Sequence, residues 1–306
     1  MFDLELIKQS TGIGQIDYHH QIGSTNDRAI ELIKQGTIST PTLVLTKNQT
    51  AGRGQRDRIW LSDEGSLTFT WIISSTDLSS GSSSKPIADS QTNDGPLDSM
   101  LPILVPLAIC YAVESTTELS GITIKWPNDL LVENQKLCGI LIESVTSTSS
   151  NSETHFVVGI GINVNNSNLE ELLNNDSKSN DSSSLESSQS QSASTHSQDD
   201  RTLRSQDSKI AICPTSIFAK TNRTTCCSKL LIAIANQLES CRSLPREEII
   251  FAYNQRLAFR GEKIRIKEPG GEECLGICEG IDSSGGLIVK IPNDTRTIFS
   301  GTITAV

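Results

Sequence analysis

The chain has 306 residues, enough for a substantial hydrophobic core and more than one domain. Its net charge is −10 and its pI is near 5.0, which argues against a general nucleic-acid binder because such proteins usually present a basic face. No apolar run approaches the roughly 20 residues that span a bilayer, and the first residues lack the basic and apolar segments of a secretory signal. The eight cysteines show no C-x-x-C and no zinc spacing, so we expect buried free thiols in a reducing cytoplasm.

The N-terminal part of the chain alternates strand-like and helix-like patterns. Ser24 and Thr25 can cap a helix that Gly36 ends. The predicted strands are residues 16–22, 42–47, 66–73, 122–126, 130–132, 137–142 and 156–164. The predicted helices are residues 27–35, 102–119, 226–242 and 247–257. Gly121 closes the second of these helices, and Pro245 lies near the first turn of the last.

Two segments, residues 74–99 and 174–208, have a different composition. Both are rich in Ser, Asp, Asn and Gln and contain almost no large apolar residues. Such segments cannot bury enough apolar surface to offset the entropy lost on ordering. We therefore expect two disordered surface inserts, and solvated insertion is favoured over a regulatory role.

From residue 259 the pattern changes to short strands separated by turns. The predicted strands are residues 263–267, 274–281, 287–291 and 297–306. The turns are predicted at residues 269–271, 283–286 and 292–294. This spacing predicts a small all-β barrel of about 50 residues, as in many binding modules.

The segment 125–143, KWPNDLLVENQKLCGILIE, is the most informative in the chain. Residues 122–126 alternate apolar and polar side chains, Pro127 ends the pairing, and a second strand follows after a turn. Lys125 would then stand at a strand end beside a rigid Trp-Pro, where it could act as a fixed cation. The alternative is an exposed lysine whose stem covers apolar surface, and the segment taken alone favours that alternative.

Residues 49–58, QTAGRGQRDR, form a second candidate site, followed closely by Trp60. Glycines let backbone N–H groups approach a phosphate, and Arg53, Arg56 and Arg58 add fork-like donors suited to phosphate or carboxylate. The P-loop pattern is absent. An anion site and a mobile basic loop are equally favoured.

The glycine and histidine patterns elsewhere in the chain mainly exclude function classes. Gly159 and Gly161 begin a dinucleotide-like pattern, but Val164 stands where its third glycine belongs and no crossover helix is predicted after it. The four histidines accompany no nucleophile or zinc-protease motif. The sequence therefore argues against a Rossmann domain, a serine hydrolase and a metalloprotease.

Several motifs together resemble the biotin protein ligases. Ser24-Thr25-Asn26, the 49–60 loop, KWPND with the following KLCGILIE, and residues 159–163 occur in that family's order. The end of the chain resembles the family's C-terminal domain. The resemblance implies an α+β fold, a mixed sheet flanked by helices as in the biotin/lipoate ligase and class II synthetase folds, followed by an SH3-like β-barrel. It implies a catalytic domain over residues 1–255 and a barrel over 256–306.

The resemblance also implies an activity. Biotin and ATP, with Mg²⁺, would give biotinyl-5′-AMP and pyrophosphate, and biotin would then pass to a lysine of a biotin carboxyl carrier protein. A lipoate–protein ligase and a non-enzymatic biotin-binding or regulatory protein are the alternatives.

Site residues carry over from the matching motifs, and none is assigned to a metal. The implied catalytic residues are Lys125 and Arg53. The implied biotin-binding residues are Ser24, Thr25, Asn26, Gln49, Arg53, Gly54, Gln55, Lys125 and Gly139. The implied nucleotide-binding residues are Arg56, Arg58, Trp60, Asn128, Lys136 and Asn163. Asn128 and Asp129 either fix the turn or contact the nucleotide.

Two departures from the family pattern have consequences. Gln55 stands where the family usually has arginine, so we expect weaker retention of the intermediate unless Arg56 or Arg58 compensates. About 15 residues precede the first strand, too few for the helix-turn-helix that some members carry. We therefore expect no DNA binding, no membrane association, a cytoplasmic location, and either a monomer or a homodimer.

Overall fold

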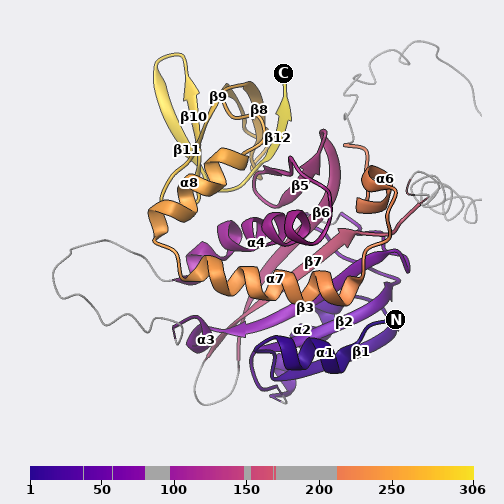
Figure 1. The fold of residues 1–306 in the computed structure, drawn as a ribbon. Helices are drawn as coiled ribbons and strands as arrows, with labels where there is room; N and C mark the ends of the chain where they lie inside the picture. Colours follow the sequence, from indigo (N-terminus) through magenta and orange to yellow (C-terminus); the bar gives the residue numbers. More distant parts are fainter. Residues whose placement is uncertain (37, 57, 80–96, 148–152, 168, 170–211) are drawn as a thin grey trace, which may run out of the picture.

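The structure is a computed structural model that describes the chain except residues 37, 57, 80–96, 148–152, 168 and 170–211. A seven-stranded mixed sheet carries helices on both faces, and a five-stranded antiparallel sheet follows it (Figure 1). The predicted fold class is therefore confirmed. The predicted insert at 174–208 lies outside the described residues.

The order of the large sheet is β1-β2-β3-β7-β6-β5-β4. β1 and β2 are parallel, and the remaining neighbours are antiparallel. The strands are β1 (Gln15–Ile22), β2 (Thr42–Gln49), β3 (Ser66–Ser74), β4 (Thr123–Lys125), β5 (Asp129–Val132), β6 (Gln135–Thr146) and β7 (Thr154–Asn163).

The register of this sheet aligns one row of residues across six strands. Starting from β4, the directly opposed residues are Lys125, Asp129, Gly139, Gly161, Thr68 and Thr46. Directly opposed residues project to the same face of a sheet. This row therefore forms a line of side chains, with a gap at its two glycines, on one face.

Helix α2 (Thr25–Gln35) covers that face. Ser24 caps it by accepting the N–H of Asp27, and Gly36 ends it in the left-handed conformation with φ 64°, as predicted. Ala29 and Leu32 of the helix pack with Val44, Ile72 and other buried residues of the sheet. The helix N-terminus thereby comes to lie beside the glycine gap.

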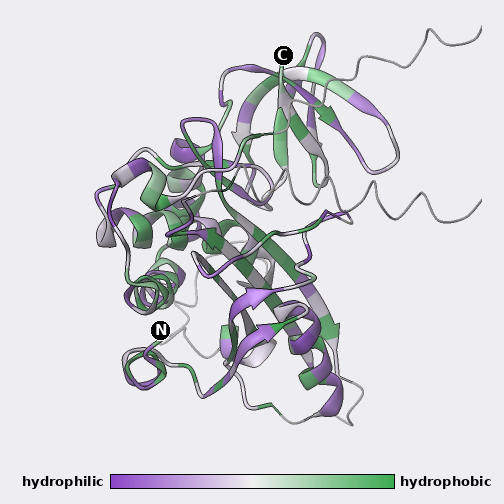
Figure 2. Ribbon diagram, turned by 90° about the vertical axis from the view of Figure 1, so that its right-hand side faces the viewer, coloured by the Kyte–Doolittle hydropathy of each residue, from purple (hydrophilic) through white to green (hydrophobic). Residues whose placement is uncertain are grey.

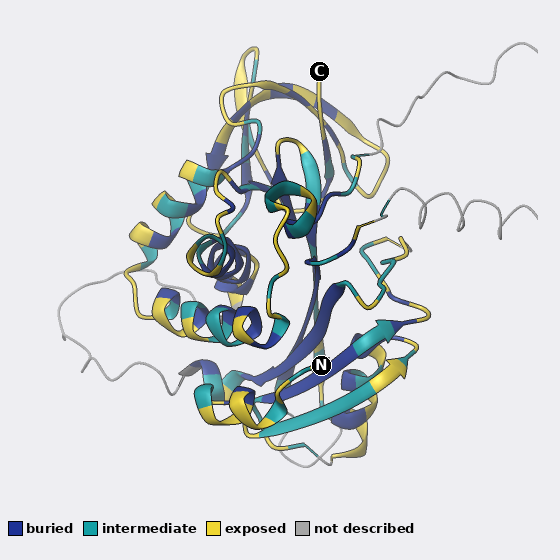
Figure 3. Cartoon of the chain, turned by 45° about the vertical axis from the view of Figure 1, so that its right-hand side comes forward, coloured by how far each residue is buried: buried dark blue, intermediate teal, exposed yellow. Residues whose placement is uncertain are grey.

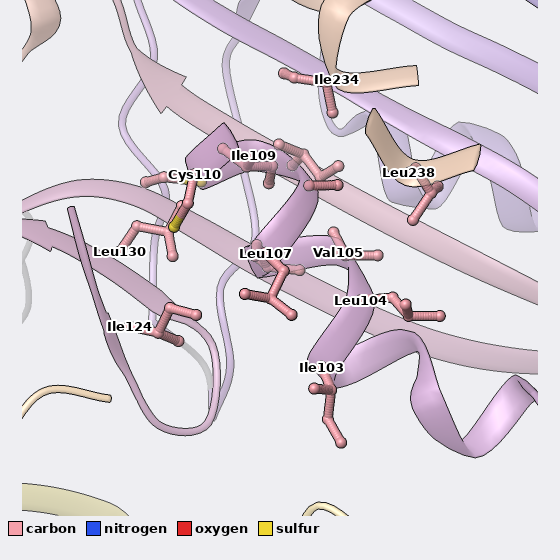
Figure 4. Packing of buried hydrophobic residues seen from close by; sticks show 14 of the residues in the cluster. Ile103, Leu104, Val105, Leu107, Ile109, Cys110, Ile124, Leu130, Ile234 and Leu238 are labelled. Atoms are coloured by element: carbon pink, nitrogen blue, oxygen red, sulfur yellow. The ribbon is translucent and has the colours of Figure 1, made fainter. Parts of the chain in front are cut away.

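Helices α4 (Leu101–Thr116) and α7 (Cys227–Arg242) cover the opposite face, where most of the core lies. Figure 4 shows Ile234 and Leu238 of α7 near the apolar residues of α4. The central strand β3 is buried along its whole length, whereas the edge strand β1 is only partly buried (Figure 3). Figure 2 shows that hydrophobic residues are concentrated along these buried central strands.

Helix α8 (Arg246–Arg256) leads into the second sheet. Its strands are β8 (Lys263–Lys267), β9 (Glu273–Ile281), β10 (Leu287–Ile291), β11 (Asp294–Ile298) and β12 (Thr302–Ala305), in the order β11-β10-β9-β8-β12. The prediction of one strand over 297–306 is wrong: the chain bends at Phe299 and Ser300, between β11 and β12, and β12 pairs with β8.

Further differences concern the helices. α4 ends at Thr116, before the predicted 119, where the Thr117 N–H bonds back to Val113 O. The predicted disordered insert at 74–99 is wrong at its edges, because α3 (Ser75–Ser79) and a 3₁₀ turn (Leu97–Met100) are described there. Helices α1 (Leu4–Ser10) and α6 (Ile217–Thr221) were not predicted. Of the helices in the described ranges, none has both the length and the apolar character needed to cross a membrane.

Candidate functional site

A cavity of about 90 Å³ lies on the α2 face of the sheet, over the glycine gap. The residues that line it come from the start of α2, the 49–60 loop, and strands β3, β5, β6 and β7. They are Ser24, Thr25, Asn26, Gln49, Arg53, Gly54, Gln55, Arg58, Ile59, Trp60, Thr68, Asn128, Asp129, Lys136, Gly139, Ile140, Leu141, Gly159, Ile160 and Gly161.

One end of the cavity is lined by the neutral polar side chains of Thr25, Asn26 and Gln49, beside the Arg53–Glu143 ion pair. Gln49 Oε1 accepts from the backbone N–H and the hydroxyl of Thr25, at 2.7 and 3.0 Å. Thr70 Oγ1 donates to Asn26 Oδ1 at 2.7 Å, and Asn26 in turn donates to Glu143 at 2.8 Å. These bonds fix the amide of Gln49 with its Nε2 group still able to donate, so this end suits a neutral polar ligand group.

The floor of the cavity is the pair Gly139 and Gly161, with the Trp60 indole resting on it. A Cβ atom on Gly161 would lie 2.5 Å from Trp60 Nε1, and one on Gly139 would lie 3.1 Å from Trp60 Cζ3. The family resemblance implies Gly139 as a biotin-binding residue, and the side chain that lies closest to its Cβ position is Trp60. A Cβ on Gly161 would displace the indole, whereas one on Gly139 would need a shift of only a few tenths of an ångström.

The other end of the cavity is cationic. Lys136 Nζ lies 2.6 Å from Asp129 Oδ1 and 5.8 Å from the centre of the Trp60 ring. Lys125 stands next to Asp129 in the same row. Burial lowers the pKa of Lys125, Asp129 opposes that shift, and the cations Lys136 and Arg58 add to it. Lys136 therefore pairs with the Asp129 carboxylate, and Lys125 and Arg58 lie within electrostatic range of this group.

The loop after β2 folds back on itself as a narrow hairpin. Gly54 N–H donates to Arg58 O at 2.6 Å, and Trp60 N–H donates to Gly52 O at 2.9 Å. Arg53 joins the hairpin to β6 through Glu143 and to the first turn of α2 through Asp27, each at 2.8 Å. The loop thus closes the cavity from above.

Beyond the loop lies a second cavity of about 570 Å³, between α4, β6 and the small sheet. It shares six lining residues with the first cavity, namely Arg53, Gly54, Gln55, Asn128, Ile140 and Leu141. The Arg53–Glu143 ion pair stands on the boundary between the two.

Most of the predicted site residues line the first cavity; Lys125, Arg56 and Asn163 do not. Arg56 donates to Thr302 Oγ1 and Ser300 Oγ of the small sheet, at 2.6 and 3.3 Å. Asn163 is buried and donates to Thr215 O at 3.0 Å. Asn128 Nδ2 donates to Ile140 O at 2.8 Å, which shows that it fixes the turn, and Asn128 also lines both cavities.

Thr68 and Glu143 of this region were not assigned from the sequence, and Asp129 was assigned only to the turn or the nucleotide. Thr68 lines the cavity, Asp129 pairs with Lys136, and Glu143 anchors Arg53. Thr68 shares strand parity with the polar Thr70, a signal that β3 carries polar side chains toward one face. The other two become visible only once the strands are aligned.

Among the described residues, no group of three or more His, Cys, Asp or Glu could hold a metal ion. Asp129 is the one carboxylate among the described residues that line the first cavity. A single carboxylate fits Mg²⁺ carried by substrate phosphates, since Mg²⁺ commonly binds one or two carboxylates and completes its shell with phosphate and water.

Two families match the chain. Residues 18–163 match the Biotin/lipoate A/B protein ligase family, and residues 260–304 match the Biotin protein ligase C terminal domain. The first match contains the whole cavity lining, and the second covers the small sheet.

Individual relatives agree with these matches. A bifunctional ligase/repressor BirA of Bacillus subtilis is 35% identical over 150 residues, covering 48% of this chain and 40% of that relative. The chain thus spans less than half the length of that relative. A biotin–[acetyl-CoA-carboxylase] ligase of Mycobacterium tuberculosis is 24% identical over 303 residues, covering 98% and 92%. The fold resembles that of a biotin protein ligase from Aquifex aeolicus in complex with biotin and ATP, with TM-score 0.62, 21% identity, and 95% and 98% coverage.

Proposed function

The chain belongs to the biotin protein ligase family, and on that premise we propose that it attaches biotin to a protein in two ATP-dependent steps. Biotin's carboxylate attacks the α-phosphate of ATP, giving biotinyl-5′-AMP and pyrophosphate. A lysine of a biotin carboxyl carrier protein then attacks the activated carbonyl, giving an amide and AMP. The family matches cover both parts of the chain, and the Mycobacterium tuberculosis ligase aligns with nearly all of it.

The observation that carries this proposal is the polarity of the first cavity. Biotin has a neutral, polar ureido ring at one end and a carboxylate at the other. Gln49, Thr25 and Asn26 supply a neutral polar end, and Lys136 with Arg58 supplies a cationic end. A molecule of biotin's polarity therefore has a preferred orientation here, with its carboxylate at Lys136.

In the first step two anions must approach each other, and cations offset their repulsion most strongly in a site that excludes water. Lys136 is the favoured cation because it lines the cavity, and Arg58 adds a second. Lys125 stands behind Asp129 and adds positive potential from there. Mg²⁺, when bound with ATP, neutralises phosphate charge. Arg53 holds the loop closed through Glu143 and Asp27.

The loop also protects the intermediate. The first cavity is far smaller than the roughly 300–1,000 Å³ of ordinary ligand sites, so ligand entry requires the 49–60 hairpin to move. Breaking the two ion pairs of Arg53 opens it, and re-forming them over bound ligand excludes water from the mixed anhydride. In the second step the acceptor lysine must be neutral, and positioning supplies the main rate gain.

Biotin-dependent exchange of labelled pyrophosphate into ATP tests the proposal. The expected result is exchange that requires biotin, that lipoate does not support, and that Lys136→Met removes. Exchange with lipoate alone would assign the chain to lipoate activation, and no exchange with either acid would make it a binding protein. The eight free thiols accord with the cytoplasmic location, which stays a prediction.

A further inference from the structure

Two buried polar atoms at the cavity floor take no part in the two steps of the proposed reaction. Thr68 is 3% exposed, and its hydroxyl has no hydrogen-bond partner among the described residues. The Trp60 indole Nε1 is also buried and, over the same residues, unpaired. A buried polar group without a partner destabilises a protein. Two such groups facing a ligand cavity indicate that the ligand supplies the missing partner.

The sheet register places these two atoms close together. Thr68 and Gly161 are directly opposed on β3 and β7, so their Cβ positions lie on the same face, about 4.5–5.5 Å apart. Trp60 Nε1 occupies the space 2.5 Å from the Cβ position of Gly161. The indole N–H therefore lies on the side of the cavity that Thr68 lines, without bonding to it. One acceptor atom between them can receive both hydrogens.

The position of the space between the Thr68 hydroxyl and the Trp60 N–H identifies the acceptor. Thr70, which bonds to Asn26, lies two residues along β3 from Thr68, a distance of about 6.7 Å on a strand. In the cross-strand direction Thr68 is separated from Asp129 by Gly161 and Gly139, so the cationic end lies further away. Thr68 is thus two residues from Thr70 but three strands from Asp129, so the space beside it lies nearer to the neutral polar end than to Lys136. In biotin, the atom between the ureido ring and the acid chain that can accept a hydrogen bond is the thioether sulfur.

We propose that Thr68 is a specificity-determining residue whose hydroxyl, with the Trp60 indole N–H, binds the ring sulfur of biotin; this rests on the proposed function. Sulfur is a weak acceptor, so the contact contributes selectivity more than affinity. Thr68→Val removes the hydroxyl at nearly constant volume. Because the hydroxyl has no partner within the described ranges, we expect its removal not to weaken the ligand-free protein.

Thr46 provides a matched control. It is directly opposed to Thr68 on β2, is fully buried, and does not line the cavity. Its hydroxyl donates to Asn48 O at 3.0 Å and accepts from Asn48 N–H at 3.2 Å. Thr46→Val therefore makes the same chemical change where the hydroxyl has protein partners.

The experiment is calorimetric titration of both variants and the wild type with biotin and with desthiobiotin, which lacks the sulfur. Thr68→Val should weaken biotin binding about 3- to 10-fold and change desthiobiotin binding less than about twofold, with an unchanged or higher Tm of the free protein. Thr46→Val should lower the Tm and change both affinities less than about twofold. Thr68→Ser, which keeps the hydroxyl, should retain the preference for biotin.

Equal losses for biotin and desthiobiotin in Thr68→Val, or no loss for either, would overturn the assignment. If Thr68→Val does not fold, the biotin-to-desthiobiotin ratio of Thr68→Ala decides in the same way. Failure of the wild type to bind biotin would instead refute the proposed function. Wild-type binding with an unchanged ratio in the variants refutes only the role of Thr68.

Discussion

Replacing Gly161 with alanine tests the floor of the cavity. The new Cβ would lie 2.5 Å from Trp60 Nε1 and 2.6 Å from Cζ2. Favourable contacts with carbon lie at about 3.5–4.0 Å, so the methyl group encroaches on the indole by about 1 Å. Both Nε1 and Cζ2 belong to one rigid ring, so the indole must shift as a whole. Trp60 must therefore move away from its position over Gly161.

The magnitude follows from two opposing terms. Overpacking costs about 1–3 kcal/mol if the indole stays, whereas replacing glycine within a strand stabilises by about 0.5–1 kcal/mol. The free protein should therefore unfold at a similar or moderately lower denaturant midpoint. Losing the aromatic wall should weaken ligand binding by about 1–3 kcal/mol, or about 5- to 150-fold.

Tryptophan fluorescence and biotin titration provide the assay. Of the three tryptophans, Trp71 and Trp126 are 3% and 4% exposed, so a shift toward solvent-like emission reports Trp60. Gly139→Ala is the graded control, since its closest contact, 3.1 Å, needs a shift of only a few tenths of an ångström. Unchanged emission with a biotin Kd within about twofold of wild type in Gly161→Ala would refute the reasoning.

Three further predictions concern the charged groups. Lys136→Met should slow pyrophosphate release about 10²-fold or more, and this loss should exceed that of Lys125→Ala. A larger loss for Lys125→Ala in a pyrophosphate assay would show that Lys125 is the lysine that contacts the reacting atoms. Gln55→Arg should slow escape of biotinyl-5′-AMP about tenfold or more, and an unchanged rate of intermediate release on rapid filtration would contradict this. Burial alone would raise the pKa of Glu114, but bonds from Arg256, at 2.7 Å, lower it overall. The Glu114–Arg256 pair therefore contributes its full stabilisation above pH 4.5, the ordinary glutamate pKa. The contribution is lost as the pH falls through the lowered pKa of the folded protein. Glu114→Gln should lower the free energy of unfolding, measured in urea, by about 1–2 kcal/mol at pH 7 and by less at pH 3. A decrease that does not depend on pH would contradict this.

Local chemistry explains why much of the fold could be predicted. The α2 helix was predicted with both ends because Ser24 and Gly36 act within a single turn of the chain. The break between β11 and β12 was missed because the pairing of β12 with β8 depends on residues more than thirty positions away. Helix α6 is a single short turn whose stability comes from buried contacts such as Ser216 Oγ with Asn166 O. No sequence period records such contacts.

The sequence by itself determined the motifs, the polar start of α2 and the glycines on which the indole rests. Only the tertiary structure decided which lysine enters the cavity. Lys136 is three residues from Gly139, so in a regular strand it would project to the opposite face. The register of β5 with β6 shifts between Leu130 and Leu131, which places Lys136 opposite Leu131 and returns it to the cavity side. A one-residue bulge arises from strand pairing, and the alternation of the sequence does not reveal it.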